Sequence, residues 1–242
     1  MVGLRFHEVM IGRIAPQSTD TGNGYRADGA VAAALAARID IPDLDLFLDR
    51  SLPHKGALSV ELRIPVLSNR PFVGHGGYFE LFQPVGADGY RMVYEATVTD
   101  LDRTYSMKGH KYLRPRRLWG WWKLWPETTT LHLTMVDVTP RGDQAPPDVD
   151  VDVPVGGDVP DWLKKIRKAT GNEPWADRDF HRPRQGAGIV RISLSRFVRQ
   201  VLSMTAVDTK CFGKPVAVAR FRWFFAWSLV KIYVLGQYAS PR

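Results

Sequence analysis

Apolar and polar residues alternate along most of the first 136 residues, and this period of two limits the chain to β-structure. Successive side chains of a strand point to opposite faces, so alternation predicts strands with one buried face. Between residues 58 and 64, for example, Leu58 and Leu62 share a face that excludes Glu61. The pattern recurs, with turn-rich links at 84–89 and 99–103, in residues 4–10, 31–41, 73–83, 91–98, 104–111 and 129–136. Strands joined by such short links are predicted to pair in antiparallel fashion.

These strands, with a further one at residues 188–192, predict a mainly β fold. We interpret it as an antiparallel lipocalin-like β-barrel of about eight strands, a size that can hold one small ligand. A two-sheet β-sandwich is the alternative. A length of 242 residues is within the range of a single all-β domain, so we predict one barrel domain over residues 1–242.

The α-helices are expected near the C-terminus. Residues 193–204 carry one apolar stripe at helical spacing. Residues 216–233 are apolar almost all round, which is typical of a helix that is buried or lies in a membrane interface. Residues 137–187 are rich in proline, glycine and aspartate, and they are interpreted as a long loop-rich insertion with a short basic helix at 161–169.

Two shorter segments in the N-terminal half also bear on helices. One or two helical turns are expected at residues 42–48, where Asp43 is placed as an N-cap. The alanines of residues 28–37 permit a helix as well. We favour a strand there, because the apolar positions alternate through Ile41.

Several classes of chemistry lack their sequence patterns. The single cysteine, Cys211, excludes an internal disulfide and a cysteine-based zinc cluster, and it fits a reducing cytoplasm. No histidine pair has metal-ligand spacing, so no metal site is predicted. Dinucleotide-binding and nucleophile-elbow motifs are missing, so no cofactor is predicted and the catalytic residues stay unknown. The N-terminal residues do not resemble a signal peptide, and no apolar run matches a membrane span, so a cytoplasmic protein is expected.

A net charge of +8 suits an anionic partner, and the basic residues are clustered. Cations and indoles mix in residues 114–125, a composition typical of membrane-interface segments. Nucleic-acid stacking and a loop that folds its tryptophans onto the barrel mouth are the other interpretations. We favour an anionic membrane or a protein partner over nucleic acid. The residues assigned to docking are Arg116, Arg117, Trp119, Trp121 and Trp122.

Two charged residues fall on apolar faces of predicted strands. Glu8 shares its face with Phe6 and Met10, and Lys111 shares its face with Met107. A buried charge is strongly unfavourable unless it is paired, so we expect these two residues to pair with one another inside the barrel. Such a pair is either a structural element, a polar anchor for a ligand, or an acid–base pair.

Three aromatic or imidazole side chains complete the candidate ligand site. His75 has the parity of Val73 and Phe79 and is predicted to point inward, where a hydrogen-bonded core histidine is the simpler interpretation. Tyr94 and Tyr105 lie on apolar faces, and either provide hydroxyls to a pocket or pack in the core. The candidate ligand-binding residues are Glu8, His75, Tyr94, Tyr105 and Lys111.

Short motifs outside residues 137–187 resemble a known family. They are Phe6-x-Glu8-x-Met10-x-Gly12, Tyr78-Phe79-Glu80-Leu81-Phe82, Met92-Val93-Tyr94, Gly109-x-Lys111, Trp125-x-x-Thr128-Thr129-Thr130-Leu131, Gly188-Ile189-Val190-Arg191-Ile192 and Ala219-Arg220-Phe221-x-x-Phe224-Phe225. The chain thereby resembles the accessory β-barrel domain fused to some cholesterol-oxidase-like (GMC) flavin oxidoreductases of actinobacteria. The resemblance implies sterol or lipid metabolism and a flavin oxidoreductase partner. It carries over no catalytic residues, and the Arg- and Trp-rich run departs from the family.

Three functional hypotheses follow. The first is a binding module for an apolar ligand, a lipid or sterol, that serves an oxidoreductase pathway. The second is a barrel enzyme that isomerises or cyclises an apolar substrate. The third is an interaction protein that docks on a membrane or an enzyme. A deep cavity with paired charges in its wall would favour the second, and a filled barrel the third.

Overall fold

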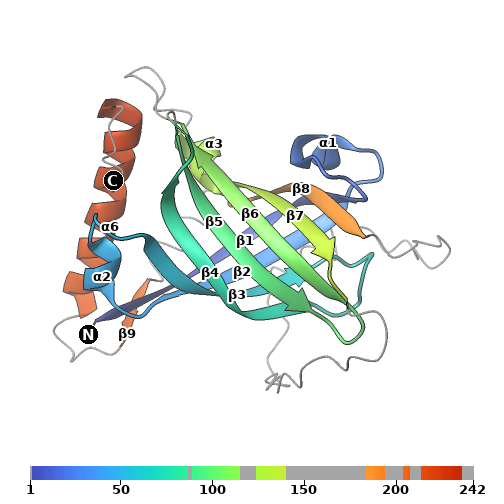
Figure 1. Ribbon diagram of the computed structural model, residues 1–242, viewed down its shortest axis with the longest axis horizontal. Helices are drawn as coiled ribbons and strands as arrows, with labels where there is room; N and C mark the ends of the chain where they lie inside the picture. The colour runs from blue at the N-terminus through green and yellow to red at the C-terminus, as the bar shows by residue number, and fades with distance from the viewer. Residues whose placement is uncertain are drawn as a thin grey trace.

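The computed structural model describes residues 2–86, 89–114, 124–139, 184–193, 204–207 and 214–235 (Figure 1). The strands are β1 (Gly3–Pro16), β2 (Val31–Ile41), β3 (His54–Arg63), β4 (Phe72–Pro84), β5 (Tyr90–Thr99), β6 (Thr104–Leu113), β7 (Thr130–Asp137), β8 (Gln185–Arg191) and β9 (Thr205–Val207). The helices are α1 (Thr21–Arg26), α2 (Leu44–Leu48), α3 (Leu124–Thr129) and α6 (Lys214–Val230), which continues as the π-helical η2 (Lys231–Leu235).

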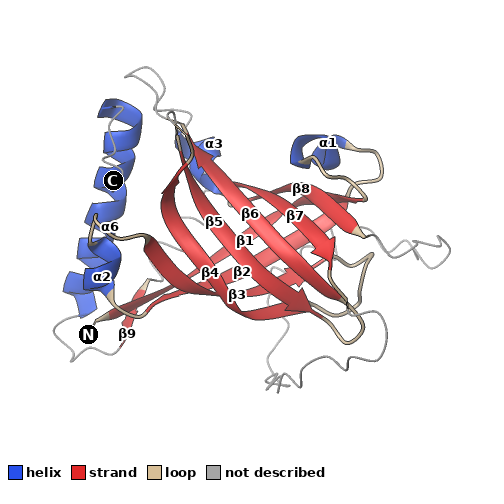
Figure 2. Ribbon diagram, viewed as in Figure 1, coloured by secondary structure: helices blue, strands red, loops and turns tan. Residues whose placement is uncertain are grey.

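Strands β1 to β8 form a closed antiparallel barrel in which each strand pairs with the next in the sequence. β1 closes the barrel, because it pairs with β2 from Leu4 to Ile14 and with β8 from Ile11 to Pro16. β9 adds to the other end of β1, opposite Gly3 to Arg5. The lipocalin-like barrel is therefore confirmed, and the two-sheet sandwich is not formed (Figure 2).

The alternation read from the sequence selects the buried face of the strands. Leu35, Leu62, Met107 and Leu133, one residue from each of four strands, are fully buried. Alternate side chains of a barrel strand point inward, and in a barrel of eight strands they fill most of the interior. The hydrophobic core of the described residues is accordingly this interior together with the end that α6 covers.

Glycine is required where β1 and β8 approach each other. A Cβ atom on Gly12 would lie 1.9 Å from the carbonyl oxygen of Ile189, and one on Gly188 would lie 2.1 Å from the carbonyl oxygen of Arg13. Backbone occupies both spaces, so neither clash is relieved by a side-chain rotation. These two glycines therefore permit the seam at which the barrel closes.

The glycine-rich residues 74–77 form a β-bulge, as their sequence suggests. The pairing of β4 with β5 shifts register between Val73 and Tyr78, and Gly76 has a φ of 73°. A second irregularity follows between Glu80 and Gln83, where Phe82 has a φ of 57°. A bulky residue at positive φ is rare, and such strain costs about 1–3 kcal/mol.

The short helices agree only partly with the sequence predictions. α2 forms as expected, with the Asp43 carboxylate accepting the backbone N–H of Asp45 at 2.9 Å. Residues 31–41 are a strand, as favoured. α1 was not predicted, because Gly22 and Gly24 lower its helix propensity; it packs on the outside of β8.

The C-terminal helix α6 lies across one end of the barrel, beside α2 (Figure 1). It confirms the helix predicted at residues 216–233. None of the described helices combines the length and apolar character needed to cross a bilayer. The predicted helix at 161–169, residues 194–203 of the predicted helix at 193–204, and most of the predicted insertion at 137–187 lie outside the described residues.

Candidate functional site

A buried polar centre lies inside the barrel, formed by Glu8 of β1, Tyr94 of β5 and Lys111 of β6. The Lys111 Nζ donates to Glu8 Oε2 at 2.8 Å, and the Tyr94 hydroxyl donates to the same oxygen at 2.9 Å. Glu8 is 6% exposed and Lys111 is 1% exposed. The expected pairing of the two inward charges is therefore confirmed, and Tyr94 joins them.

The contacts of this polar centre leave hydrogen-bonding capacity on the cation. An ammonium group has three N–H donors. Within the described residues Lys111 gives one of them to Glu8, and its Nζ lies 5.0 Å from the centroid of the Tyr94 ring. Burial, and then the charge of Glu8, raise the pKa of Tyr94 well above its usual range, so its hydroxyl stays a donor.

A series of aromatic rings in edge-to-face and tilted contact lies between the polar centre and α6. The Phe79 ring lies 5.1 Å from that of Tyr94 and 6.1 Å from that of Phe6, measured between centroids. Phe6 in turn lies 5.7 Å from Phe221 of α6. The end of the barrel beneath α6 is thus an apolar layer over a charged floor.

His54, the first residue of β3, lies under α6 and was missed as an interior residue because the sequence placed it in a loop. It is buried, its Nδ1 lies 2.6 Å from the carbonyl oxygen of Phe47, and its ring centroid lies 5.1 Å from that of Phe224. Burial lowers the pKa of His54, and the hydrogen bond to Phe47 opposes that effect. The parity of Leu58, extended back to His54, was the signal that could have placed it.

Tyr105 is buried as predicted, but it lies near the opposite end of the barrel. Its ring packs against Phe72 at 5.3 Å, and within the described residues its hydroxyl has no hydrogen-bond partner. It lines a pocket of about 10 Å³ together with Ile14, Ile64 and Met135. Such a volume admits about one water molecule. The structure therefore does not bring Tyr105 together with Glu8.

The prediction that His75 points into the barrel is wrong. His75 is exposed, whereas Phe72 and Gly74 before it and Phe79 after it are buried. The bulge at Gly76 adds a residue and reverses the parity of the strand. His75 and Phe79, which share a parity in the sequence, therefore lie on opposite faces of the strand.

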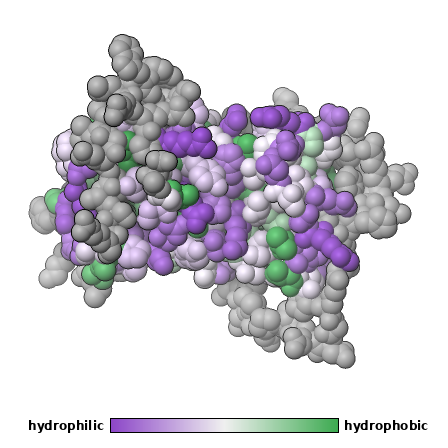
Figure 3. All heavy atoms as spheres, turned by 45° about the horizontal axis from the view of Figure 1, so that its top comes forward, coloured by the Kyte–Doolittle hydropathy of each residue, from purple (hydrophilic) through white to green (hydrophobic). Residues whose placement is uncertain are grey.

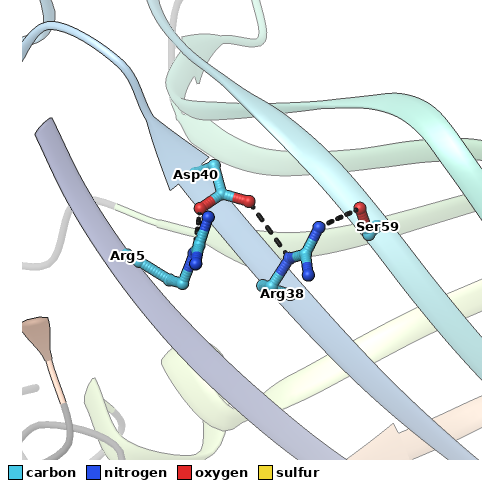
Figure 4. Close-up of polar contacts among 4 residues, drawn as sticks. All are labelled: Arg5, Arg38, Asp40 and Ser59. Atoms are coloured by element: carbon cyan, nitrogen blue, oxygen red, sulfur yellow. Dashed lines mark hydrogen bonds and ion pairs between the residues drawn. The ribbon is translucent and has the colours of Figure 1, made fainter. Parts of the chain in front are cut away.

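A polar network crosses the outer face of β1, β2 and β3 (Figure 4). The Asp40 carboxylate accepts from Arg5 and, at 3.1 Å, from Arg38 Nε, and Arg38 reaches the Ser59 hydroxyl at 3.3 Å. These side chains are partly exposed, so the ion pairs contribute at most about 1 kcal/mol each. We assign them to pairing of the three strands rather than to a site.

The residues predicted for docking, Arg116, Arg117, Trp119, Trp121 and Trp122, lie outside the described residues. The described residues on either side of them are fixed close to the C-terminal helix. The backbone N–H of Arg114 donates to Glu127 Oε2 at 3.0 Å, and the Tyr233 hydroxyl donates to the same oxygen at 2.7 Å.

Neither the search for metal ligands, nor the surface, nor comparison with known proteins indicates a further site in the part of the chain that the structure describes. The described residues contain no cluster of three side chains that could hold a metal ion. On the face drawn in Figure 3 the described residues are mostly hydrophilic, and hydrophobic residues gather in small separate groups. Comparison with family models, with curated proteins and with solved structures gave no match to this chain.

Proposed function

We propose that the protein binds an apolar molecule with one polar head group, a lipid or sterol, at the α6 end of the barrel. The observation that carries the proposal is the buried Lys111 ammonium, which has donors to spare beneath an aromatic layer. A hydroxyl or carboxylate head group would accept a hydrogen bond from Lys111, and the apolar body would take the place of the ring contact between Phe6 and Phe79.

Binding of this kind requires α6 to move. The interior of the described barrel is filled by its own side chains, and ligand pockets for drug-sized molecules measure roughly 300–1,000 Å³. Two energetically unfavourable features lie at the contact between α6 and the barrel. Phe82, whose ring stacks on Phe225 of α6, has the strained φ of 57°. The Ser228 hydroxyl of α6 is buried without a hydrogen-bond partner among the described residues, which is unfavourable.

The filled interior favours a second candidate function, docking on a membrane or on a flavin oxidoreductase. Both functions fit a cytoplasmic protein that associates with membranes peripherally. The enzyme hypothesis receives less support, because Tyr94 is held protonated and the carboxylate of Glu8 is occupied by two donors.

The test compares wild type with the variant Glu8→Leu/Tyr94→Phe/Lys111→Met, using a fluorescent long-chain fatty acid and a fluorescent sterol as probes. Apolar replacement of a buried ion pair is often neutral for stability, so the variant is expected to fold. We expect its affinity for a bound probe to fall at least about tenfold, the effect of losing one charged hydrogen bond. Tyr105→Phe, at the other end, is the matched control. Equal affinity of variant and wild type, or no binding of either probe to wild type, would contradict the proposal.

A further inference from the structure

Helix α6 presents an apolar stripe to solvent on the side away from the barrel. Val216 is 59% exposed and Trp223 is 71% exposed, while Trp227 and Val230 are each 39% exposed. Their spacing of seven, four and three residues places them on one helix face. At 1.5 Å per residue the stripe is about 21 Å long.

The two indoles of the stripe form one flat surface. Trp223 and Trp227 are one helical turn apart, their ring planes are 2° from parallel, and their centroids are 6.1 Å apart. The opposite side of the helix holds Phe221 and Phe224, which pack on the barrel. α6 is therefore apolar on both sides, and the barrel covers only one of them. Exposed large apolar side chains gathered on one face and bordered by polar residues are typical of interaction sites.

Cations accompany the indoles. The Lys231 ammonium lies 5.9 Å from the centroid of the Trp227 ring. Arg220 belongs to the stripe by its spacing, its side chain is 54% exposed, and it is paired with the exposed Asp45 at 2.8 Å. The whole chain carries a net charge of +8. Tryptophans flanked by snorkelling cations are the composition of helices that lie in the headgroup region of a bilayer.

We propose that the outer face of α6 docks on an anionic lipid bilayer, with Trp223 and Trp227 inserted at headgroup depth and Lys231 facing lipid phosphates. The charge complementarity selects the occupant, because an apolar protein groove would gain little from cations beside the indoles. This inference does not depend on the proposed ligand.

The experiment is flotation of the full-length protein with phosphatidylcholine vesicles, with and without phosphatidylglycerol. We expect wild type to bind the anionic vesicles and to bind the neutral ones weakly. Trp223→Ser/Trp227→Ser should reduce binding at least about tenfold, since more than one exposed apolar side chain is lost. Lys231→Gln should reduce it about fivefold and make it less sensitive to salt.

Leu101→Ser is the matched control, because Leu101 is 75% exposed in the turn between β5 and β6, away from α6. It should bind as wild type does. Equal binding by wild type and the double-tryptophan variant, or no binding to anionic vesicles, would overturn the proposal. Equal binding to neutral and anionic vesicles would also contradict it. If size-exclusion chromatography shows that wild type is a dimer and that the double-tryptophan variant is a monomer, the α6 face binds a second copy of the chain and the bilayer proposal is overturned. The ligand test uses no vesicles, so failure of one proposal leaves the other intact.

Discussion

Lys111→Met should destabilise the barrel far more than a substitution of similar volume normally does. The methionine fills a similar volume, but the Glu8 carboxylate, which is 6% exposed in the wild-type barrel, loses its cation. Breaking a buried ion pair by removing one partner costs about 3–5 kcal/mol, because a buried charge remains uncompensated. The Tyr94 hydroxyl still donates to Glu8, so we expect the lower part of that range.

The double variant Glu8→Leu/Lys111→Met should be more stable than Lys111→Met alone. It leaves no buried charge, and what remains is an unpaired Tyr94 hydroxyl, a cost of about 1–3 kcal/mol. Urea denaturation followed by circular dichroism gives the free energy of unfolding for wild type, the two single variants and the double variant. The cycle then isolates the coupling between Glu8 and Lys111.

Lys108→Met is the matched control on the same strand. Lys108 lies 3.6 Å from Glu95 on the outer face, its side chain is 55% exposed, and its loss should change the free energy of unfolding by less than about 1 kcal/mol. The reasoning is refuted if Lys111→Met is no more destabilising than Lys108→Met. It is also refuted if the free energy of unfolding of the double variant falls by the sum of the two single changes, since Glu8 and Lys111 would then not be coupled.

Three further predictions concern the seam, the buried histidine and the closing helix. Gly12→Ala should prevent normal folding or lower the melting temperature sharply, because its Cβ meets the Ile189 carbonyl, whereas Gly29→Ala, with open space around it, should be tolerated in the same thermal melt. The depressed pKa of His54 means that the unfolded chain binds its proton first, so the stability contributed by neutral His54 is present above about pH 6.5 and is lost as the pH falls below that value. Urea titrations at pH 7 and pH 5 should show a lower free energy of unfolding at pH 5. His54→Gln should make the difference between the two pH values smaller, and an unchanged difference would assign the pH dependence to other groups. Phe221→Ala should cost about 3–5 kcal/mol at the α6 contact, and hydrogen exchange should accelerate in α6 before it does in the strands; uniform acceleration would contradict a separate opening of α6.

The barrel was predictable because alternation depends on a property that each residue carries alone. Leu58, Val60 and Leu62 identify a buried face without any knowledge of their neighbours, and the same parity placed Glu8 and Lys111 inside. That two inward charges must be paired follows from the free energy of burying them, so their contact was predictable as well.

The errors arise where one residue changes the count. His75 faces solvent because the positive φ of Gly76 inserts a bulge, and a sequence of glycines does not say which of them is inserted. His54 is buried because Phe47 of the preceding helix and Phe224 of the distant helix α6 cover it, and the contact with Phe224 is not visible in the local sequence. The exposed indoles of α6 were hidden for another reason, since an apolar helix read alone does not show which side its partner covers.

The closure of the barrel through β1 has a consequence for the order of folding. Ile14 pairs with Gly188, and Leu4 pairs with Ala206, so β1 can pair with β8 and β9 only after the strands between them in the sequence have been synthesised. Contacts between such distant residues slow folding, because the loop between them must be closed first. Until then the outer edge of β1 presents unpaired backbone groups to any other extended chain. We therefore expect the nascent chain to be most prone to misassembly along residues 3–16 during the time before β8 pairs with β1.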